Sequence, residues 1–184
     1  MSRQLLGFVG ESGSGKDTAA MYVGEKYKFE YISSSDYLRS YCRQQGLPWR
    51  SRKEVSRSAD KIRIQHGSTF IIEESIRNAS ANKIVISGIY SYTEAECVAK
   101  QGHIIRLRSP LEKRYRNITE RDQERDKRLS YSEFKSQSVA EVEKPRSQDL
   151  KSLAVFSESM SIDNTGTVPE LYHKIDLMMA KLYG

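Results

Sequence analysis

Three glycines and a lysine follow the first apolar run of the chain, Leu5–Val9, and open a stretch with a helical pattern from Lys16 to Lys26. Their spacing is G-x-x-x-x-G-K between a strand and a helix. Glycines let the backbone wrap closely, so that N–H groups point at phosphate oxygens, and the helix N-terminus adds its positive end. Lys16 can then reach the β- and γ-phosphates. The pattern predicts a nucleoside triphosphate site made of Gly10, Gly13, Ser14, Gly15, Lys16, Asp17 and Thr18.

The residue after Lys16 departs from the usual phosphate loop. Asp17 stands where a Ser or Thr ordinarily contacts magnesium, and Thr18 follows one place later. We interpret Asp17 as a magnesium ligand, because a carboxylate is a harder and more strongly charged oxygen donor than a hydroxyl. A second interpretation stays open, since an acidic residue in the first turn of a helix is also favoured by the helix dipole alone.

Short apolar runs alternate with longer amphipathic stretches along the chain. Strands separated by helices imply a mostly parallel sheet that is covered on both faces. The sequence therefore predicts an α/β fold of three layers with a five-stranded parallel sheet. The strands are expected at 5–9, 29–32, 84–86, 104–107 and 161–163.

The helical segments have recognisable breaks and starts. The segment 35–81 is polar and mostly helical in pattern, with breaks near Gly46–Pro48 and His66–Gly67. No linker or repeat divides the chain, so residues 1–184 are expected to form a single domain. Three later helix starts combine a small polar capping residue with a glutamate three positions on, at Ser109, Ser130 and Thr167.

Composition excludes several classes of protein. With 38% hydrophobic and 29% charged residues, the chain has enough apolar material for a core and is too balanced in charge for disorder. No apolar run approaches the roughly 20 residues of a membrane span, and two cysteines are too few for a disulfide framework or a zinc site. We expect a cytoplasmic monomer or homodimer with no signal peptide and no membrane partner. The net charge of +6 fits either a phosphate-bearing ligand or an ordinary solvated surface.

The residues around the glycines carry a family resemblance. The run Gly-Ser-Gly-Lys-x-Thr, with no hydroxyl directly after the lysine, resembles the P-loop nucleoside-monophosphate kinases. Tyr31–Arg39 resembles the adenylate kinase segment that reads His-Ile-Ser-Thr-Gly-Asp-Leu-Leu-Arg. In that family, small polar residues and the terminal arginine line the acceptor nucleotide site. The resemblance thus implies that Ser35, Asp36 and Arg39 bind the acceptor, with Arg39 at its phosphate.

Later segments extend the resemblance over nearly the whole chain. The strand before Gly88 sits where the family has a strand that ends in Asp-Gly, which implies Gly88 on the acceptor side. The run after Ile162 resembles the last strand and loop of dephospho-CoA kinases, which implies Asn164 and Gly166 near adenine. Small adenylate-kinase-related proteins match at Ala59–Arg63, which adds Arg63 as an acceptor residue.

Two positions depart from that family. Ser87 replaces the aspartate at the end of the third strand that helps to hold magnesium, and Tyr90 stands where relatives often have arginine. Asp17 would compensate for the lost aspartate, because the metal site would then keep one carboxylate.

A basic segment follows the fourth strand. Between His103 and Arg128 there are nine Lys/Arg residues and five acidic ones. One interpretation is a lid at about 114–130 that closes over the phosphates and excludes water. The match to relatives implies that Arg121 lies beside adenine and that Arg125 contacts a phosphate. The other interpretation is a solvated helix with neighbouring Glu and Arg side chains.

The segment 35–81 also has two interpretations. As an acceptor-binding insertion, it would use arginines for a phosphate and aromatic rings for a base. As a helical cover over the sheet edge, it would place Trp49 in a small separate core.

These expectations combine into one leading hypothesis. The protein would be an ATP- and Mg²⁺-dependent kinase in which Lys16, Arg121 and Arg125 act in phosphoryl transfer. Its partner would be a small nucleotide-like phosphate acceptor, first a nucleoside or deoxynucleoside monophosphate and second dephospho-CoA. The competing hypothesis is a nucleotide-binding regulator or a nucleic-acid-associated NTPase, which draws on the positive charge and on Ser87. For the kinase we expect no nucleic acid as a partner.

Overall fold

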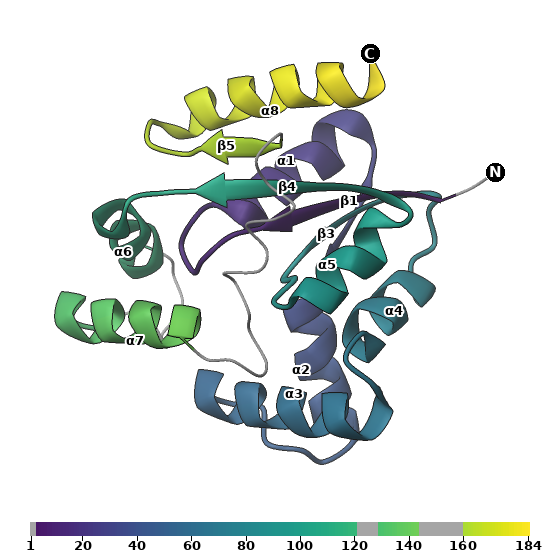
Figure 1. Ribbon diagram of the computed structural model, residues 1–184, viewed down its shortest axis with the longest axis vertical. Helices are drawn as coiled ribbons and strands as arrows, with labels where there is room; N and C mark the ends of the chain where they lie inside the picture. The colour runs from purple at the N-terminus through teal and green to yellow at the C-terminus, as the bar shows by residue number, and fades with distance from the viewer. Residues whose placement is uncertain (1–2, 121–128, 144–159) are drawn as a thin grey trace.

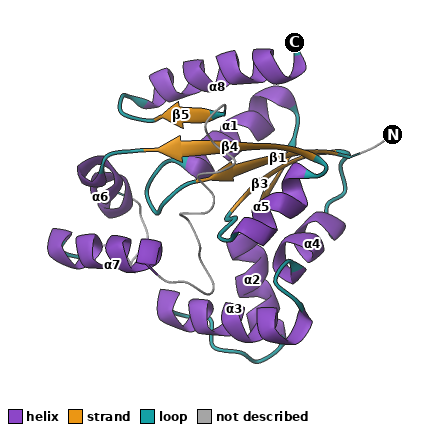
Figure 2. Ribbon diagram, viewed as in Figure 1, coloured by secondary structure: helices purple, strands orange, loops and turns teal. Residues whose placement is uncertain are grey.

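The computed structural model describes residues 3–120, 129–143 and 160–184. Five strands form one parallel sheet in the order β2-β3-β1-β4-β5. They are β1 Gln4–Val9, β2 Glu30–Ser33, β3 Lys83–Ser87, β4 Gly102–Arg108 and β5 Ser161–Asp163. Helices cover both sides of this sheet (Figure 2). The predicted three-layer α/β fold is therefore confirmed.

The helices fall into four pairs, which Figure 1 shows around the sheet. Helices α1 and α8 pack on one face of it, α4 and α5 pack on the other, and α2 and α3 extend from the latter side. Helices α6 and α7 lie beyond the carboxyl end of β4 (Figure 1). The bounds are α1 Lys16–Tyr27, α2 Ser34–Gln44, α3 Arg52–His66, α4 Phe70–Arg77, α5 Tyr92–Ala99, α6 Leu111–Thr119, α7 Tyr131–Glu143 and α8 Val168–Tyr183.

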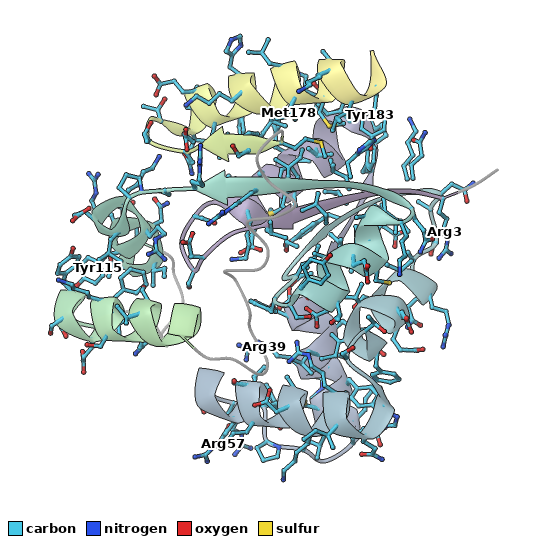
Figure 3. The ribbon with its side chains drawn as sticks, in the orientation of Figure 1. Arg3, Arg39, Arg57, Tyr115, Met178 and Tyr183 are labelled. Atoms are coloured by element: carbon cyan, nitrogen blue, oxygen red, sulfur yellow. The ribbon has the colours of Figure 1, made fainter. Side chains whose placement is uncertain are left out.

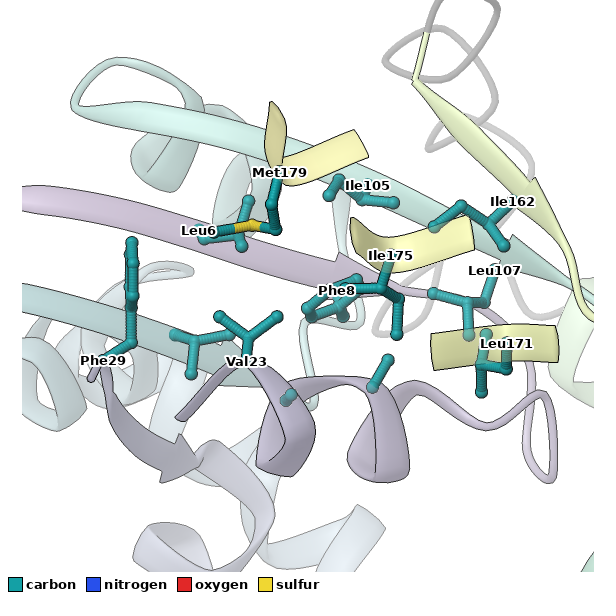
Figure 4. Close-up of a cluster of buried hydrophobic side chains, with 13 residues drawn as sticks. Leu6, Phe8, Val23, Phe29, Ile105, Leu107, Ile162, Leu171, Ile175 and Met179 are labelled. Atoms are coloured by element: carbon teal, nitrogen blue, oxygen red, sulfur yellow. The ribbon is translucent and has the colours of Figure 1, made fainter. Parts of the chain in front are cut away.

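Strand β1 lies in the middle of the sheet and sends alternate side chains to its two faces. Leu6 and Phe8 are fully buried against α1 and α8, in the apolar layer that Figure 4 shows. Leu5 and Val9 are fully buried in the opposite layer, with residues of α4 and α5. The carboxyl end of β1 therefore emerges between two packed layers, and the glycine cluster begins at that point.

The segment 35–81 consists mainly of α2, α3 and α4, which share a core of their own. Leu38, Cys42, Ile62 and Ile71 are buried in it, and Trp49 packs against it partly buried. The chain leaves helical structure at 45–51 and at 67–69, close to the two predicted breaks. This small core supports the interpretation that places Trp49 in a separate cluster, although the same indole also lines the pocket described below.

Two of the three predicted helix caps are confirmed, and one is wrong. Thr167 forms a capping box with Glu170, and the Ser130 hydroxyl accepts from the N–H of Glu133. At the third, Pro110 is itself the N-cap of α6, and the Ser109 hydroxyl is buried without a hydrogen-bond partner among the described residues. The physical reason is the backbone of Pro110, whose ψ of 149° is extended rather than helical, so the helix begins one residue later.

Helix α5 is an element that the sequence analysis did not predict. It begins with a capping box in which Ser91 and Glu94 bond each other's backbone N–H groups. Only eight residues long, it buries Ala95 and Val98 against the sheet. Across the described ranges, the chain has no helix long and apolar enough to cross a membrane.

Candidate active site

The glycine cluster forms a loop between β1 and α1, and Gly13, Ser14 and Gly15 in it are buried. Gly15 is the N-cap of α1 with a φ of 97°, and no side chain caps the first turn of that helix. The free N–H groups of a helix N-terminus attract anions such as phosphate. Gly13 has a φ of 81°, and a Cβ there would lie 2.4 Å from the Arg114 carbonyl oxygen. The loop therefore needs glycine both for its turn and for its close approach to α6.

Lys16 is the first residue of α1 and is only 7% exposed. Within 3–120, 129–143 and 160–184, no carboxylate forms an ion pair with its ammonium group. A buried cation without a counter-charge is costly, so such a position suits a site that receives an anion. The geometry agrees with the predicted role of Lys16 at a triphosphate.

Three side chains hold the outer side of this loop. The carbonyl oxygens of Ser12, Gly13 and Ser14 accept hydrogen bonds from Arg114, Asn117 and Asn164. Asn164 was predicted at the nucleotide, and the structure places its side chain, 5% exposed, on the loop backbone at 2.9 Å from the Ser14 oxygen. Asn164 thus holds the backbone of the predicted phosphate loop.

Lys113 ties the predicted adenine loop to α6. Its ammonium group donates to the Asn164 side-chain oxygen at 2.8 Å and to the carbonyl oxygen of Gly166. Burial lowers the pKa of Lys113, and the positive charges of Arg116 and Lys174 lower it further. Gly166, the other residue predicted near adenine, thus has its carbonyl group already engaged by a lysine.

The half-buried phenol of Tyr31 in β2 lies beside the carboxyl end of β3. Tyr31 and Ser87 share a hydrogen bond of 3.1 Å between their hydroxyl groups. Burial raises the pKa of Tyr31, the bond to Ser87 opposes that rise, and the negative charges of Asp17 and Asp36 add to it. Asp17 stands in the first turn of α1 and Asp36 in the first turn of α2, so both carboxylates belong to the carboxyl edge of the sheet.

These residues suit a magnesium ion that arrives with a nucleotide. Mg²⁺ in nucleotide sites is held by one or two carboxylates together with phosphate oxygens and water. Asp17, with Asp36 nearby, offers that donor set, and the described part of the chain contains no cluster of three or more His, Cys, Asp or Glu that would hold a metal by itself.

A pocket of about 200 Å³ opens beside α2. It lies next to the face of this helix that buries Leu38 and Cys42. Arg39 donates a 3.1 Å hydrogen bond to the carbonyl oxygen of Trp49 across this pocket. The pocket combines two guanidinium groups, one carboxylate, one hydroxyl and an indole. Its lining residues are Asp36, Arg39, Ser40, Arg43 and Trp49.

The loop after β3 joins this region to the sheet. Ser34 donates to the Gly88 carbonyl oxygen, and the Ser35 hydroxyl shares a 2.7 Å hydrogen bond with Tyr90. The structure thus brings Ser35 and Gly88, both predicted at the acceptor, to the start of α2. Tyr90, one of the two positions that depart from the resembled family, is thereby bonded to α2.

Arg63, also predicted at the acceptor, is engaged by a buried carboxylate. Its guanidinium donates to Glu94 at 2.8 and 3.2 Å, and the two side chains are 12% and 1% exposed. The other Glu94 oxygen accepts from the N–H groups of Tyr90 and Ser91. Glu94 therefore fixes Arg63 to the loop that follows β3.

The sequence analysis did not single out two of these residues, Glu94 and Asn117. Two residues that it did single out lie outside the described ranges. Arg121 and Arg125 lie in the segment 121–128, which the structure does not describe. The signal for Glu94 was the Ser91–Glu94 capping pattern. The only sequence signal for Asn117 was its spacing of three residues from Arg114, which puts both side chains on one face of α6.

Comparison with known proteins agrees with this geometry. The family model described as AAA domain matches residues 9–131. Comparison with curated proteins gave no match. Shikimate kinase from Acinetobacter baumannii in complex with shikimate gives a TM-score of 0.66 at 21% identity, over 99% of this chain and 96% of that one. A gluconokinase from Sinorhizobium meliloti 1021 gives 0.55 at 15% identity, over 98% and 93%.

Sequence identities this low establish a likeness of fold alone, whereas the match to the family model also establishes a family. Its match spans more than half of the chain and begins at the end of β1, directly before the glycine loop. The protein therefore belongs to the AAA-domain family and has the fold of the P-loop kinases.

Proposed function

We propose that this protein is an ATP-dependent kinase that transfers the γ-phosphoryl group to a small anionic acceptor. The observation that carries the proposal is the position of Asp36. It lines the arginine pocket from the first turn of α2, which follows the carboxyl end of β2, and the phosphate loop follows the carboxyl end of β1 in the same parallel sheet. The pocket and the loop are thus neighbours at one end of the sheet, as a transfer between two bound molecules requires.

The residues present have distinct tasks in such a transfer. The loop N–H groups and Lys16 would bind the β- and γ-phosphates and neutralise charge on the transferred group. Arg39 and Arg43 would bind the anionic end of the acceptor. Asp17 would hold Mg²⁺, with Asp36 close by, and the bound ion would supply further neutralisation of phosphate charge.

We propose a nucleoside or deoxynucleoside monophosphate as the acceptor. Two arginines suit a phosphate, and the Trp49 indole beside them suits a planar base. Dephospho-CoA is the second candidate. The names of the similar structures add shikimate and gluconate, which carry a carboxylate and hydroxyl groups in place of a phosphate and a base.

The test is turnover, with ATP and with GTP, on a panel of these compounds. Coupled-enzyme assays would compare the nucleoside and deoxynucleoside monophosphates, dephospho-CoA, shikimate and gluconate. Turnover on monophosphates supports the proposal as stated, and turnover on a hydroxy acid alone would keep the kinase and replace the acceptor. No turnover on any compound would remove the kinase assignment.

Arg39→Ala is expected to weaken the acceptor far more than ATP. A charge-assisted contact to phosphate contributes about 1.5–3 kcal/mol, which corresponds to a rise of about ten- to a hundredfold in the acceptor KM. Arg57→Ala is the matched control, because Arg57 is an exposed arginine on the side of α3 away from Arg39 (Figure 3). A loss of ATP affinity with an unchanged acceptor KM would place Arg39 at the nucleotide instead.

Asp17→Asn is expected to raise the magnesium concentration needed for half-maximal activity, and excess magnesium should restore part of the rate. The amide keeps the size of the side chain and removes the charge that a hard cation prefers. Titration of activity with MgCl₂ at saturating ATP measures the change. An unchanged magnesium requirement with a small loss of thermal stability would leave Asp17 as a charge that favours the helix end.

A further inference from the structure

Three consecutive carbonyl groups of the phosphate loop are held by side chains from distant parts of the chain. Arg114 donates to the Ser12 oxygen at 3.4 Å, and Asn117 donates to the Gly13 oxygen at 2.8 Å. Asn164 donates to the Ser14 oxygen at 2.9 Å. A trans peptide carries its C=O and N–H on opposite sides, so a bond that fixes a carbonyl group also fixes the direction of the N–H in the same peptide.

Helix α6 supplies two of these donors from one face and packs directly on the loop. Arg114 and Asn117 are three residues apart, which places both side chains on the same side of the helix. The Arg114 carbonyl oxygen lies 2.4 Å from the position of a Cβ on Gly13, so no side chain fits between the two backbones. Arg114 is 8% exposed, and its guanidinium lies 5.7 Å from the ring centre of Phe134 in α7.

The third donor is also attached to α6. Lys113 donates to the side-chain oxygen of Asn164 at 2.8 Å, while the Asn164 amide nitrogen donates to Ser14. The hydrogen bonds therefore form a closed circuit: α6 bonds to the loop through Arg114 and Asn117, and the loop is linked back to α6 through Asn164 and Lys113. A shift of α6 would alter all three carbonyl contacts together.

We propose that Asn117 is a positioning residue for the triphosphate, and that α6 as a whole sets the shape of the phosphate loop. Asn117 fixes the peptide that joins Gly13 to Ser14, whose N–H donates to the Glu11 carbonyl oxygen at 3.1 Å. This turn leads directly into residues 15–18, whose N–H groups would receive the phosphates. The ligand named here rests on the proposed function. By linkage, a triphosphate that binds the braced loop also stabilises α6 against local opening.

The test uses the full chain and three variants. Asn117→Ala removes the donor, and Asn117→Leu removes it while it keeps a side chain of similar size. Thr119→Ala is the control, because Thr119 is a neutral polar residue of the same helix whose hydroxyl bonds only within α6 in the described contacts. Amide hydrogen exchange of residues 10–18 is measured without ligand, ATP affinity is measured by calorimetry, and the melting temperature is followed in parallel.

We expect the loop amides of both Asn117 variants to exchange faster in the ligand-free protein. Both variants should also bind ATP about tenfold more weakly, as the loss of one partly buried hydrogen bond implies. Thr119→Ala should change neither quantity. Loop exchange rates and an ATP affinity that match those of the wild type would overturn the proposal. A lower melting temperature with both of these quantities unchanged would also overturn it. If the wild-type protein binds no ATP, the proposed function fails, while the exchange rates of the ligand-free variants still decide whether Asn117 shapes the loop.

Discussion

Lys16→Ala is expected to lower the rate of phosphoryl transfer by about a hundred- to a thousandfold or more, because it removes a fixed positive charge from the transferred group. The melting temperature without nucleotide should stay close to that of the wild type. Lys16 is 7% exposed and has no carboxylate partner among the described residues, so its removal breaks no ion pair there. The stabilisation by ATP should disappear, since a ligand raises the melting temperature only as far as it binds the folded state.

The measurement combines turnover with thermal unfolding at several ATP concentrations. Lys61→Ala is a suitable control, because it removes the same charge from an exposed position on α3. A Lys16 variant that still turned over substrate and still gained the full ATP-dependent rise in melting temperature would contradict the assignment of the phosphate loop.

Glu94→Ala is expected to cost about 3–5 kcal/mol of unfolding free energy, the range for removing one partner of a buried ion pair. The Arg63 guanidinium, 12% exposed, would lose its 2.8 Å partner, and the N–H groups of Tyr90 and Ser91 would lose their acceptor. Glu96→Ala on the same helix is the matched control. Its partner Lys100 lies 3.5 Å away at the surface, and such pairs contribute about 0–1 kcal/mol.

Urea unfolding of the wild type and the variants would measure this difference. Glu94→Gln should fall between the wild type and alanine, because the amide oxygen still accepts one backbone N–H while the charge is lost. Equal midpoints for the Glu94 and Glu96 variants would mean that the buried pair adds no stability beyond that of a surface pair.

The three central strands of the sheet, β3, β1 and β4, were predictable because each contains a local apolar run. Runs such as Leu5–Val9 and Ile84–Ile86 are buried on both faces, so they lack the polar alternation of an exposed strand. Helix α5 escaped prediction for the opposite reason. It is only eight residues long and buries two apolar residues, Ala95 and Val98, so it has no extended helical pattern of apolar residues. Its clearest signal is the capping box at its start.

The phosphate loop was predictable because all of its parts lie within nine consecutive residues. What holds the loop in place was not, because hydrogen bonds to backbone carbonyls leave no pattern of residue types in the sequence. Asn164 illustrates the limit. Its place after the last strand pointed to the nucleotide, yet its side chain bonds to the Ser14 carbonyl. Likewise, Arg63 was predicted by resemblance, but its buried partner Glu94 belongs to the unpredicted helix.

The circuit around the phosphate loop has a consequence for how the chain folds during synthesis. The bonds to Ser12, Gly13 and Ser14 span 102, 104 and 150 residues of sequence. A nascent chain that has emerged through β3 contains the complete glycine motif and none of the side chains that hold its carbonyls. Closing loops of that length is slow compared with forming a helix or a turn. The glycine motif, the first part of the site to be synthesised, is therefore expected to be among the last to take its final shape. Nucleotide binding that needs the braced loop would begin only after Asn164 has emerged.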